Sequence, residues 1–499
     1  MGFKIQQSCP QCGAPIELEE TDRLIECPYC EARSIMSPTD CLRYVMQHNA
    51  KGKDIVYAPY IRFKGAAFYC QGDDIDYRVV DISDAGTSLK VLRPSLGVRT
   101  QTVKANFVSP DLGGTYLPVD KDAEEIVARA AKLPNVKPGT FLSRPATTSN
   151  GISIWQVLST EVTSEGDLLE ERRSRRNLAW ASDHSRITPE TDPDEIQYYV
   201  AIGENLSIVY FPLYREGDIL YDAIINDPIG EVQEEDKAIL GTADANPRWQ
   251  VKFLPIMCPY CGWDLKGSRS SVAFTCSNCF SAWEISSGKL RQASLLVVPP
   301  EQDNAEYLPF WRINATCPDL GVSSYADLIR LDKPLTPAEQ IPDIPVSFII
   351  PAFKIAPKML LTTAQRMTFS QHILPPVQQE AQVHSISAVT LPRDEAIESI
   401  KIVLANGAYE KHDVISRLTE AQVHATDSAL IYLPFNDSGY ELSAQYGIQV
   451  SIIKQSLELV SDLAAQKKVE NTVTSLDCPL CGKDVPASSS HCPYCGIRL

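Results

Sequence analysis

Twelve of the 15 cysteines in this chain form three groups of four, and each group consists of two Cys-x2-Cys pairs. A pair with this spacing can place two thiolates on one metal ion, and a second pair completes a tetrahedral set of four ligands. Three complete quartets are a far more specific pattern than a single pair. They predict three metal sites, whose ligands are Cys9, Cys12, Cys27 and Cys30, then Cys258, Cys261, Cys276 and Cys279, and finally Cys478, Cys481, Cys492 and Cys495.

Zinc is the ion that the quartets predict. Each quartet supplies four thiolates and leaves no position open for water or a substrate, which is typical of structural rather than catalytic zinc. Fourteen residues separate the two pairs in the first and second quartets, and ten residues separate them in the third. Iron held as in rubredoxins is the alternative, but rubredoxin-like sites usually have a longer loop between the pairs. We therefore predict three structural Zn²⁺ ions.

The residues around the cysteines indicate how each pair turns. Four of the six pairs read Cys-Pro-x-Cys-Gly, and the glycine allows the positive φ angle that directs backbone N–H groups at the sulfurs. Glu31 and Phe280 stand in place of this glycine after the other two pairs, so the hydrogen bonding to the sulfurs there is left open.

These motifs resemble the knuckles of zinc-ribbon proteins, and residues 478–499 resemble the short ribbons appended to many prokaryotic proteins. The chain as a whole resembles a group of bacterial multi-zinc-ribbon proteins to which no activity is assigned. This resemblance rests on the ribbons and a few dozen other residues. It implies ribbons attached to β-rich bodies and implies nothing about a reaction.

The elements that must hold the ribbons occur twice in the chain. Three pairs of similar segments follow the first and second quartets in the same order: 57–63 with 307–313, 115–126 with 390–397, and 208–214 with 430–435. The first and last of these pairs place a proline among aromatic and β-branched residues that alternate as in strands. We interpret the chain as a tandem duplication, in which the first copy carries an insertion.

The predicted fold is therefore of the α+β class, with three four-cysteine zinc ribbons attached to two tandemly duplicated β-rich bodies. Hairpins are expected to turn at Gly217 and Gly439, and helices are expected over 122–133, 394–405 and about 450–466. Because proline cannot donate to a β-ladder, the strands that contain it are expected at sheet edges or bulges. The predicted boundaries are 1–36 for ribbon 1, 37–247 for body A with its insertion near 140–198, 248–286 for ribbon 2, 287–468 for body B, 469–476 for a linker and 477–499 for ribbon 3.

A search for catalytic groups finds one local pair. Cys41 and His48 are seven residues apart on an expected helix, which would place them on one face as a nucleophile and its base. Simple packing of the two side chains beside Val45 is the more ordinary interpretation, and Cys70 and Cys317 are likewise expected in the core. The chain contains no Walker A loop, GxGxxG, HExxH or GxSxG motif. We therefore assign no catalytic residue.

Two groups of arginines could contact a partner. Arg62 and Arg312 stand at equivalent positions in the two halves, where each can either grip a carboxylate or cover aromatic surface with its stem. The arginines in the segment 172–176 could contact RNA. Acidic residues in 165–171 precede them directly, so charges paired on a solvated surface are the simpler interpretation.

Charge and composition limit the classes of function. The formal net charge is −17 at pH 7, and an acidic body repels phosphate backbones, which counts against nucleic-acid binding. No run of about 18 apolar residues and no apolar signal core occur, so we expect no membrane span and a cytoplasmic location.

These observations favour a non-enzymatic zinc-binding scaffold that binds protein partners within a multiprotein assembly, with no small-molecule substrate inferred. The alternative is nucleic-acid binding by a face of ribbon 2, where Lys252, Trp263 and the stretch 266–269 supply basic and aromatic side chains. An enzyme that uses Cys41 and His48 is a third hypothesis.

Overall fold

The computed structural model describes most of the chain outside the insertion and the C-terminal segment. The described residues are 4–38, 40–97, 103–123, 125–126, 143–147, 153–157, 196–245, 249–286, 288–302, 305–375, 387–458, 475–477 and 484–486. The third cysteine quartet, the Arg-rich segment 172–176 and most of the helix expected over 122–133 lie outside these residues.

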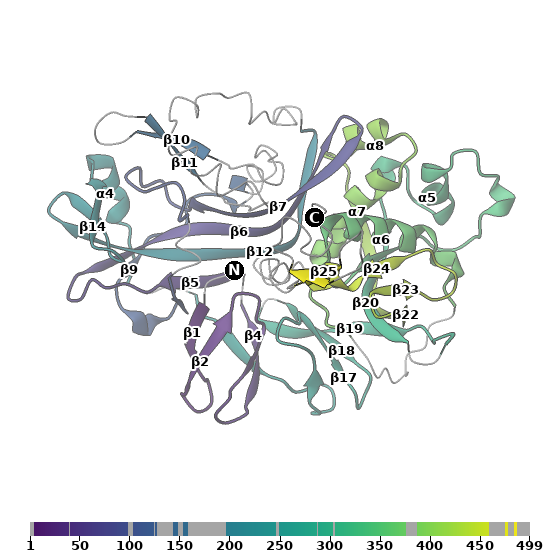
Figure 1. The fold of residues 1–499 in the computed structure, drawn as a ribbon, viewed down its shortest axis with the longest axis horizontal. Coiled ribbons are helices and arrows are strands. Elements are labelled where there is room, and N and C mark those ends of the chain that lie inside the picture. The colour runs from purple at the N-terminus through teal and green to yellow at the C-terminus, as the bar shows by residue number, and fades with distance from the viewer. Residues whose placement is uncertain are drawn as a thin grey trace.

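Two large sheets and a group of helices confirm the α+β class. The N-terminal half forms a ten-stranded sheet and the C-terminal half forms a nine-stranded sheet. Figure 1 shows the long strands of the first sheet on one side of the molecule, most of the helices on the other side, and two ribbons that project together below.

The ribbons are built from short strands on either side of the cysteine pairs. Ribbon 1 contains β1 (Lys4–Ser8), β2 (Pro15–Glu19), β3 (Leu24–Glu26) and β4 (Arg33–Ser37). Ribbon 2 contains β15 (Lys252–Pro255), β16 (Leu265–Lys266), β17 (Ala273–Cys276) and β18 (Ala282–Ser286).

The described part of body A consists mostly of strands. Its elements are β5 (Leu42–Met46), β6 (Ile55–Gln71), β7 (Asp74–Ala85), β8 (Ala105–Phe107), β9 (Thr115–Tyr116), β10 (Ser143–Thr147), β11 (Ser153–Val157), β12 (Tyr198–Glu216), β13 (Ile219–Asp222), β14 (Asp227–Glu231) and α4 (Glu234–Leu240). The hairpin between β12 and β13 turns at Gly217, whose φ angle is 60°, as the sequence predicts.

Body B adds helices to a similar set of strands. Its elements are β19 (Lys289–Val297), β20 (Glu306–Thr316), α5 (Tyr325–Asp332), β21 (Ser347–Pro351), α6 (Pro357–Phe369), α7 (Arg393–Gly407), α8 (Lys411–Arg417), β22 (His424–Asp437), β23 (Glu441–Ala444), β24 (Ser451–Ile453) and α9 (Lys454–Glu458). A short pair, β25 (Ser475–Asp477) and β26 (Asp484–Pro486), follows. The helix expected over 394–405 is confirmed as α7. The one expected from 450 was wrong at its start, where β24 pairs with β23.

The two bodies have the same strand order and the same register. β5 lies parallel to β12 and β12 lies antiparallel to β6, while β19 lies parallel to β22 and β22 lies antiparallel to β20. Pro59 is opposite Tyr210 in the first body, and Pro309 is opposite Tyr432 in the second. Each proline therefore meets a tyrosine that stands two residues before another proline, at Pro212 and Pro434 respectively.

The expectation that proline confines these strands to sheet edges or bulges was wrong for β6 and β20, whose register shifts lie away from Pro59 and Pro309. β6 lies between β12 and β7, and β20 lies between β22 and β21. Pro59 and Pro309 are tolerated because each lies one residue beyond the last paired residue of its strand with β7 or β21. There the Pro59 carbonyl accepts from Gly86 N–H and the Pro309 carbonyl accepts from Ala352 N–H, while the side that faces β7 or β21 requires no proline N–H.

The two halves are joined through a shared core. Phe68, Cys70 and Ile202 belong to body A, yet they are buried in the same apolar cluster as the sheet and helices of body B. At this junction Gly203 N–H donates to the carboxylate of Glu395 in α7 over 2.5 Å. The far ends of β6 and β12 therefore serve as the surface on which body B packs.

Candidate metal centres

The first two cysteine quartets converge, as the sequence predicts. In each quartet the four Sγ atoms all lie within 4.8 Å of one another. In ribbon 1, Cys9 Sγ is 3.8 Å from Cys30 Sγ and Cys12 Sγ is 3.7 Å from Cys27 Sγ. In ribbon 2 the corresponding distances are 3.6 Å for Cys258 with Cys279 and 3.4 Å for Cys261 with Cys276.

These distances fit one tetrahedral metal ion. A Zn–S bond of about 2.3 Å places the sulfurs of a regular tetrahedron about 3.8 Å apart, whereas a disulfide would bring two sulfurs to about 2.05 Å. Both quartets can therefore hold a metal ion with all four thiolates. The third quartet, Cys478, Cys481, Cys492 and Cys495, lies outside the described residues.

All four knuckles close with the same backbone turn. The N–H of the first cysteine donates to the carbonyl of the residue five positions on, as from Cys9 to Ala14 over 2.8 Å and from Cys276 to Ser281 over 2.8 Å. Glu31 and Phe280 adopt positive φ angles of 58° and 53° although they are not glycine. The turn is therefore imposed by the site and not only by the glycine.

The ring of thiols favours a cation at its centre. Backbone N–H groups of Cys12 and Gln11 hydrogen-bond to Cys9 and lower its pKa to about 6. The Ala32 N–H favours the thiolate of Cys30 too, but hydrogen bonding with Cys12 and the other neighbouring thiols raises its pKa to about 12. Cys9 and Cys30 therefore do not ionise together on their own, and a cation bound between them would stabilise both as thiolates.

Ser281 supports the sulfurs of ribbon 2 and was missed by the sequence analysis. Its hydroxyl accepts from the Trp283 indole N–H over 2.8 Å and lies 3.0 Å from Cys279 Sγ and 3.5 Å from Cys258 Sγ. Burial disfavours the Cys258 thiolate, but the Ser281 hydroxyl and the backbone N–H of Cys261 lower its pKa to about 6. Outer hydrogen bonds of this kind orient metal ligands.

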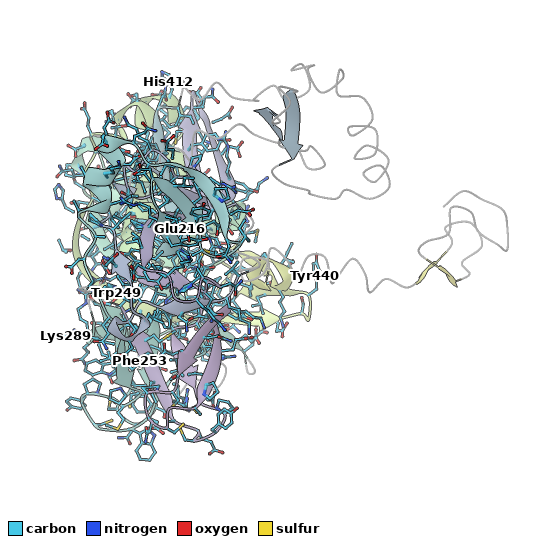
Figure 2. All side chains as sticks on the ribbon, turned by 90° about the vertical axis from the view of Figure 1, so that its left-hand side faces the viewer. Glu216, Trp249, Phe253, Lys289, His412 and Tyr440 are labelled. Carbon is cyan, nitrogen blue, oxygen red and sulfur yellow. The ribbon has the colours of Figure 1, made fainter. Side chains whose placement is uncertain are left out.

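The two ribbons form one unit. β15 of ribbon 2 pairs antiparallel with β4 of ribbon 1, with Phe253 opposite Met36, to make a three-stranded sheet with β3. Arg23 N–H and Leu24 N–H of ribbon 1 both donate to the Arg269 carbonyl of ribbon 2. Figure 2 places Phe253 toward the end of the molecule where the ribbons lie.

A common apolar core lies beneath these two sites. Leu24 and Ile35 of ribbon 1 are buried with Phe274 and Trp283 of ribbon 2, in a cluster that also includes Cys258 and Cys276. β1 pairs with β8 and β18 pairs with β19, so each ribbon also continues the large sheet of its own half. Nothing in the local sequence of either ribbon indicates this pairing.

The candidate pair Cys41 and His48 is not supported. The segment expected as a helix is the strand β5, and a strand rises about 3.3 Å per residue, so the two side chains are far apart. Burial raises the pKa of the Cys41 thiol to about 11, the opposite of what a nucleophile requires. Cys70 and Cys317 are fully buried in the core, as predicted.

Arg62 and Arg312 share a register but differ in environment. Arg62 is fully buried, pairs with Glu20, and binds both carboxylate oxygens of Asp81 over 2.8 Å. Arg312 is half-buried, and no ion pair to it occurs among the described residues. Arg62 thus grips carboxylates of its own chain, which tie the turn of ribbon 1 to the sheet of body A.

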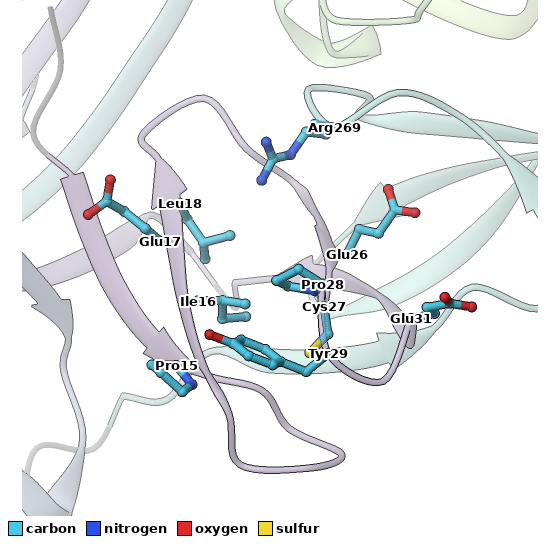
Figure 3. A pocket seen from close by; sticks show the side chains of 10 residues that line it. All are labelled: Pro15, Ile16, Glu17, Leu18, Glu26, Cys27, Pro28, Tyr29, Glu31 and Arg269. Carbon is cyan, nitrogen blue, oxygen red and sulfur yellow. The ribbon is translucent and has the colours of Figure 1, made fainter.

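A groove in ribbon 1 has exposed side chains that the metal site does not use. Figure 3 shows Tyr29 and Ile16 within it, with Glu17 on one side, Glu26 and Glu31 on the other, and Arg269 above. The groove encloses about 730 Å³. Tyr29 is 68% exposed, and at the tip of ribbon 2 Tyr260 and Trp263 are 77% and 57% exposed.

Comparison of the chain with protein-family models, curated proteins and solved structures finds no match. Among the helices of the described residues, none is both long and apolar enough to cross a membrane.

Proposed function

We propose that the protein is a non-enzymatic zinc-binding scaffold, which holds a partner protein at its paired ribbons within a larger assembly. The observation that carries the proposal is the exposure of Tyr29, Tyr260 and Trp263 on the knuckles of two rigid metal sites. Large aromatic side chains held in fixed positions lose little entropy on binding and are enriched at the centres of protein interfaces. The separation of Cys41 from His48 supports a non-enzymatic role.

The partner segment is predicted to be basic and partly apolar. The groove of ribbon 1 offers Ile16, Pro28 and Tyr29 as an apolar surface. Glu26 and Glu31 at its side are exposed and have no ion pair among the described residues, and the chain carries a net charge of −17. Charge complementarity would steer a basic segment to this surface and fix its register.

The proposal includes three zinc ions and a tandem duplication. The Sγ geometry of two quartets supports zinc in ribbons 1 and 2, and the two Cys-x2-Cys pairs between Cys478 and Cys495 support the third. The shared strand order and the equivalent pairs, Pro59 with Tyr210 and Pro309 with Tyr432, support the duplication.

Nucleic-acid binding by ribbon 2 is the second candidate. Trp263 and Lys266 are exposed on this ribbon, which favours it. Arg269 opposes it, because its guanidinium lies 3.6 Å from Asp22 and is already partly neutralised.

The experiment is affinity capture by the full-length, zinc-loaded protein from lysate of its native host, with and without nuclease, read by mass spectrometry. The same capture is repeated with Tyr29→Ala/Tyr260→Ala and with the control Tyr409→Ala, which alters a tyrosine that is 72% exposed on body B. We expect stoichiometric protein partners that survive nuclease, are released by increasing salt, and are lost only with the ribbon variant.

Partners that are lost after nuclease treatment would favour nucleic-acid binding as the function instead. Partners retained by the ribbon variant at full zinc content would reject the ribbons as the docking surface.

A further inference from the structure

A second cavity of about 730 Å³ lies where the four parts of the molecule meet. Ribbon 1 contributes the turn at residues 21–23, body A contributes residues of β6, β7 and the first part of β12, and ribbon 2 contributes residues 268–270. Body B closes it with residues 353–357, between β21 and α6. A cavity of this size can hold a small organic ligand.

Much of the wall is apolar. Five apolar side chains line the cavity, and each is at least nine-tenths buried from solvent: Phe68, Ile202, Phe353, Ile355 and Leu360. Gly65 and Ala66 in β6 keep the wall open, since neither carries a large side chain. The wall therefore suits the apolar part of a ligand.

The polar part of the wall is positively charged, although the chain as a whole is acidic. Four cationic side chains line the cavity against one carboxylate, that of Asp22; the cations belong to Arg23, Lys64, Arg269 and Lys354. Three of them already have partners: Arg23 donates to Asn205 Oδ1 over 3.1 Å, Lys64 lies 3.9 Å from Glu20 Oε2, and Arg269 lies 3.6 Å from Asp22.

Lys354 is the cation without a partner. Its backbone N–H donates to Thr390 Oγ1 over 2.8 Å, but its Nζ has no hydrogen bond or ion pair among the described residues. Burial lowers the pKa of its ammonium; Glu395 opposes this shift, and the charges of Arg23 and Lys64 add to it. An anion beside Nζ would compensate the charge of this partly buried side chain.

The N-terminus of α6 adds to the positive electrostatic potential of the cavity. Ala356 and Pro357 line the cavity, and this helix of 13 residues begins there without a side-chain cap or an acidic residue in its first turn. The partial positive charge of the helix end is therefore directed at the region of Lys354.

We propose that this cavity binds a small organic anion, with a carboxylate or phosphate group at Lys354 and an apolar body against Phe68, Ile202 and Leu360. The ligand site goes beyond the scaffold function and does not depend on it. Because its wall contains residues of both ribbons and both bodies, an occupant would stabilise their assembly.

The test is fluorescence titration of the full-length, zinc-loaded protein with 1-anilinonaphthalene-8-sulfonate, an anion with an apolar body. N-phenyl-1-naphthylamine, which lacks the acid group, serves as the neutral probe. We expect Lys354→Met to weaken binding of the anionic probe about tenfold, as loss of one charge-assisted contact does, and to change binding of the neutral probe less than twofold. Lys358→Met, at an exposed position in the first turn of α6, is the matched control and should leave both affinities unchanged.

Competition identifies the acid group. Octanoate and octyl phosphate are each titrated against the anionic probe, with octanol as the neutral competitor. Displacement by either acid at much lower concentration than octanol supports the proposal. The acid that displaces the probe at the lower concentration identifies the preferred group. Equal displacement by octanol, or equal affinity of the anionic probe for Lys354→Met and the original protein, overturns it.

A second variant protects the test against a folding defect. Lys354→Arg keeps the charge and should retain affinity for the anionic probe within about threefold. If Lys354→Met binds neither probe and shows no thermal unfolding transition, it has failed to fold. The comparison of Lys354→Arg with Ala66→Phe then tests the site instead. Ala66→Phe fills the cavity and should abolish binding of both probes, and probe binding that survives it would place the site elsewhere.

Discussion

Arg62 and Arg312 occupy equivalent register positions in the two sheets but differ in burial and in ion pairing. Each lies two residues beyond a Tyr-x-Pro-aromatic segment, opposite Ser207 and Ala429 respectively. Only Arg62 has a ribbon packed over it, and Glu20 from that ribbon is 3% exposed. The buried pair thus arises from the position of ribbon 1 and not from the strand that carries Arg62.

Substitution Arg62→Met is expected to lower the free energy of unfolding by about 3–5 kcal/mol, because it leaves the buried Glu20 carboxylate with only the more distant Lys64, at 3.9 Å, as a charge partner. Chemical denaturation followed by tryptophan fluorescence measures the loss. Arg312→Met is the matched control and should cost less than about 1 kcal/mol. The double variant Arg62→Met/Glu20→Met should recover much of the stability, and failure to do so would mean that packing, not the unpaired charge, is what matters.

The knuckle residue Glu31 holds a left-handed conformation that glycine adopts without strain. Its side chain is exposed, so its replacement removes no core contact. We expect Glu31→Gly to raise the stability of the zinc-loaded protein by roughly 0.5–1 kcal/mol and to leave the zinc content unchanged. Thermal unfolding gives the first value and elemental analysis the second. A loss of stability would show that the carboxylate has a favourable role at the knuckle.

At the scale of elements, the pairing of β4 with β15 turns two separate metal ribbons into one structural unit. The strands are antiparallel neighbours from opposite halves of the chain, and the cluster beneath them contains Cys258 and Cys276. We therefore expect distortion of one cysteine quartet to affect the other through the shared sheet and core.

Substitution Cys12→Ser should remove one zinc ion per chain and speed chelator-induced release of zinc from ribbon 2 about tenfold, a coupling of about 1.4 kcal/mol. Release is followed with a chromogenic chelator. Cys481→Ser is the control, because the sequence places its quartet beyond a linker. It should also remove one zinc ion, but leave the release rate from ribbon 2 unchanged. Red, iron-containing protein from metal-supplemented cultures would contradict zinc as the native ion.

At the scale of the whole molecule, the bodies have their own sheets but not fully separate cores. Phe68 and Ile202, from body A, are buried against body B, whereas most of body A packs in its own cluster together with part of ribbon 1. A single cooperative transition is expected for the intact protein, because the shared cluster couples the bodies.

Substitution Phe68→Ala removes the largest of these shared side chains and should cost about 3–5 kcal/mol. We expect it also to separate calorimetric unfolding into two transitions, one for each body. Leu213→Ala, in the cluster that contains no residue of body B, is the matched control: it should lower stability by about 2–5 kcal/mol and keep one transition. A single transition in both variants would indicate that other contacts couple the bodies.

The sequence alone determined the features that depend on neighbouring residues. The spacing of the cysteines defined the ligand sets of ribbons 1 and 2, and the glycines at 217 and 439 defined two hairpin turns, because these geometries are set within a few residues. The alternation around the prolines identified the strands, but not their central position in the sheets. That position follows from where the neighbouring strands end, which the local sequence does not state.

The tertiary structure alone decided the features that join distant parts of the chain. The pairing of β4 with β15, the burial of Arg62 beneath ribbon 1 and the cavity around Lys354 each combine segments more than 40 residues apart. Their side chains resemble ordinary surface or strand residues in the sequence. Burial of the charge, pairing with a partner strand and formation of the cavity occur only when the sheets and ribbons pack. The reason is that desolvation depends on the whole surrounding structure.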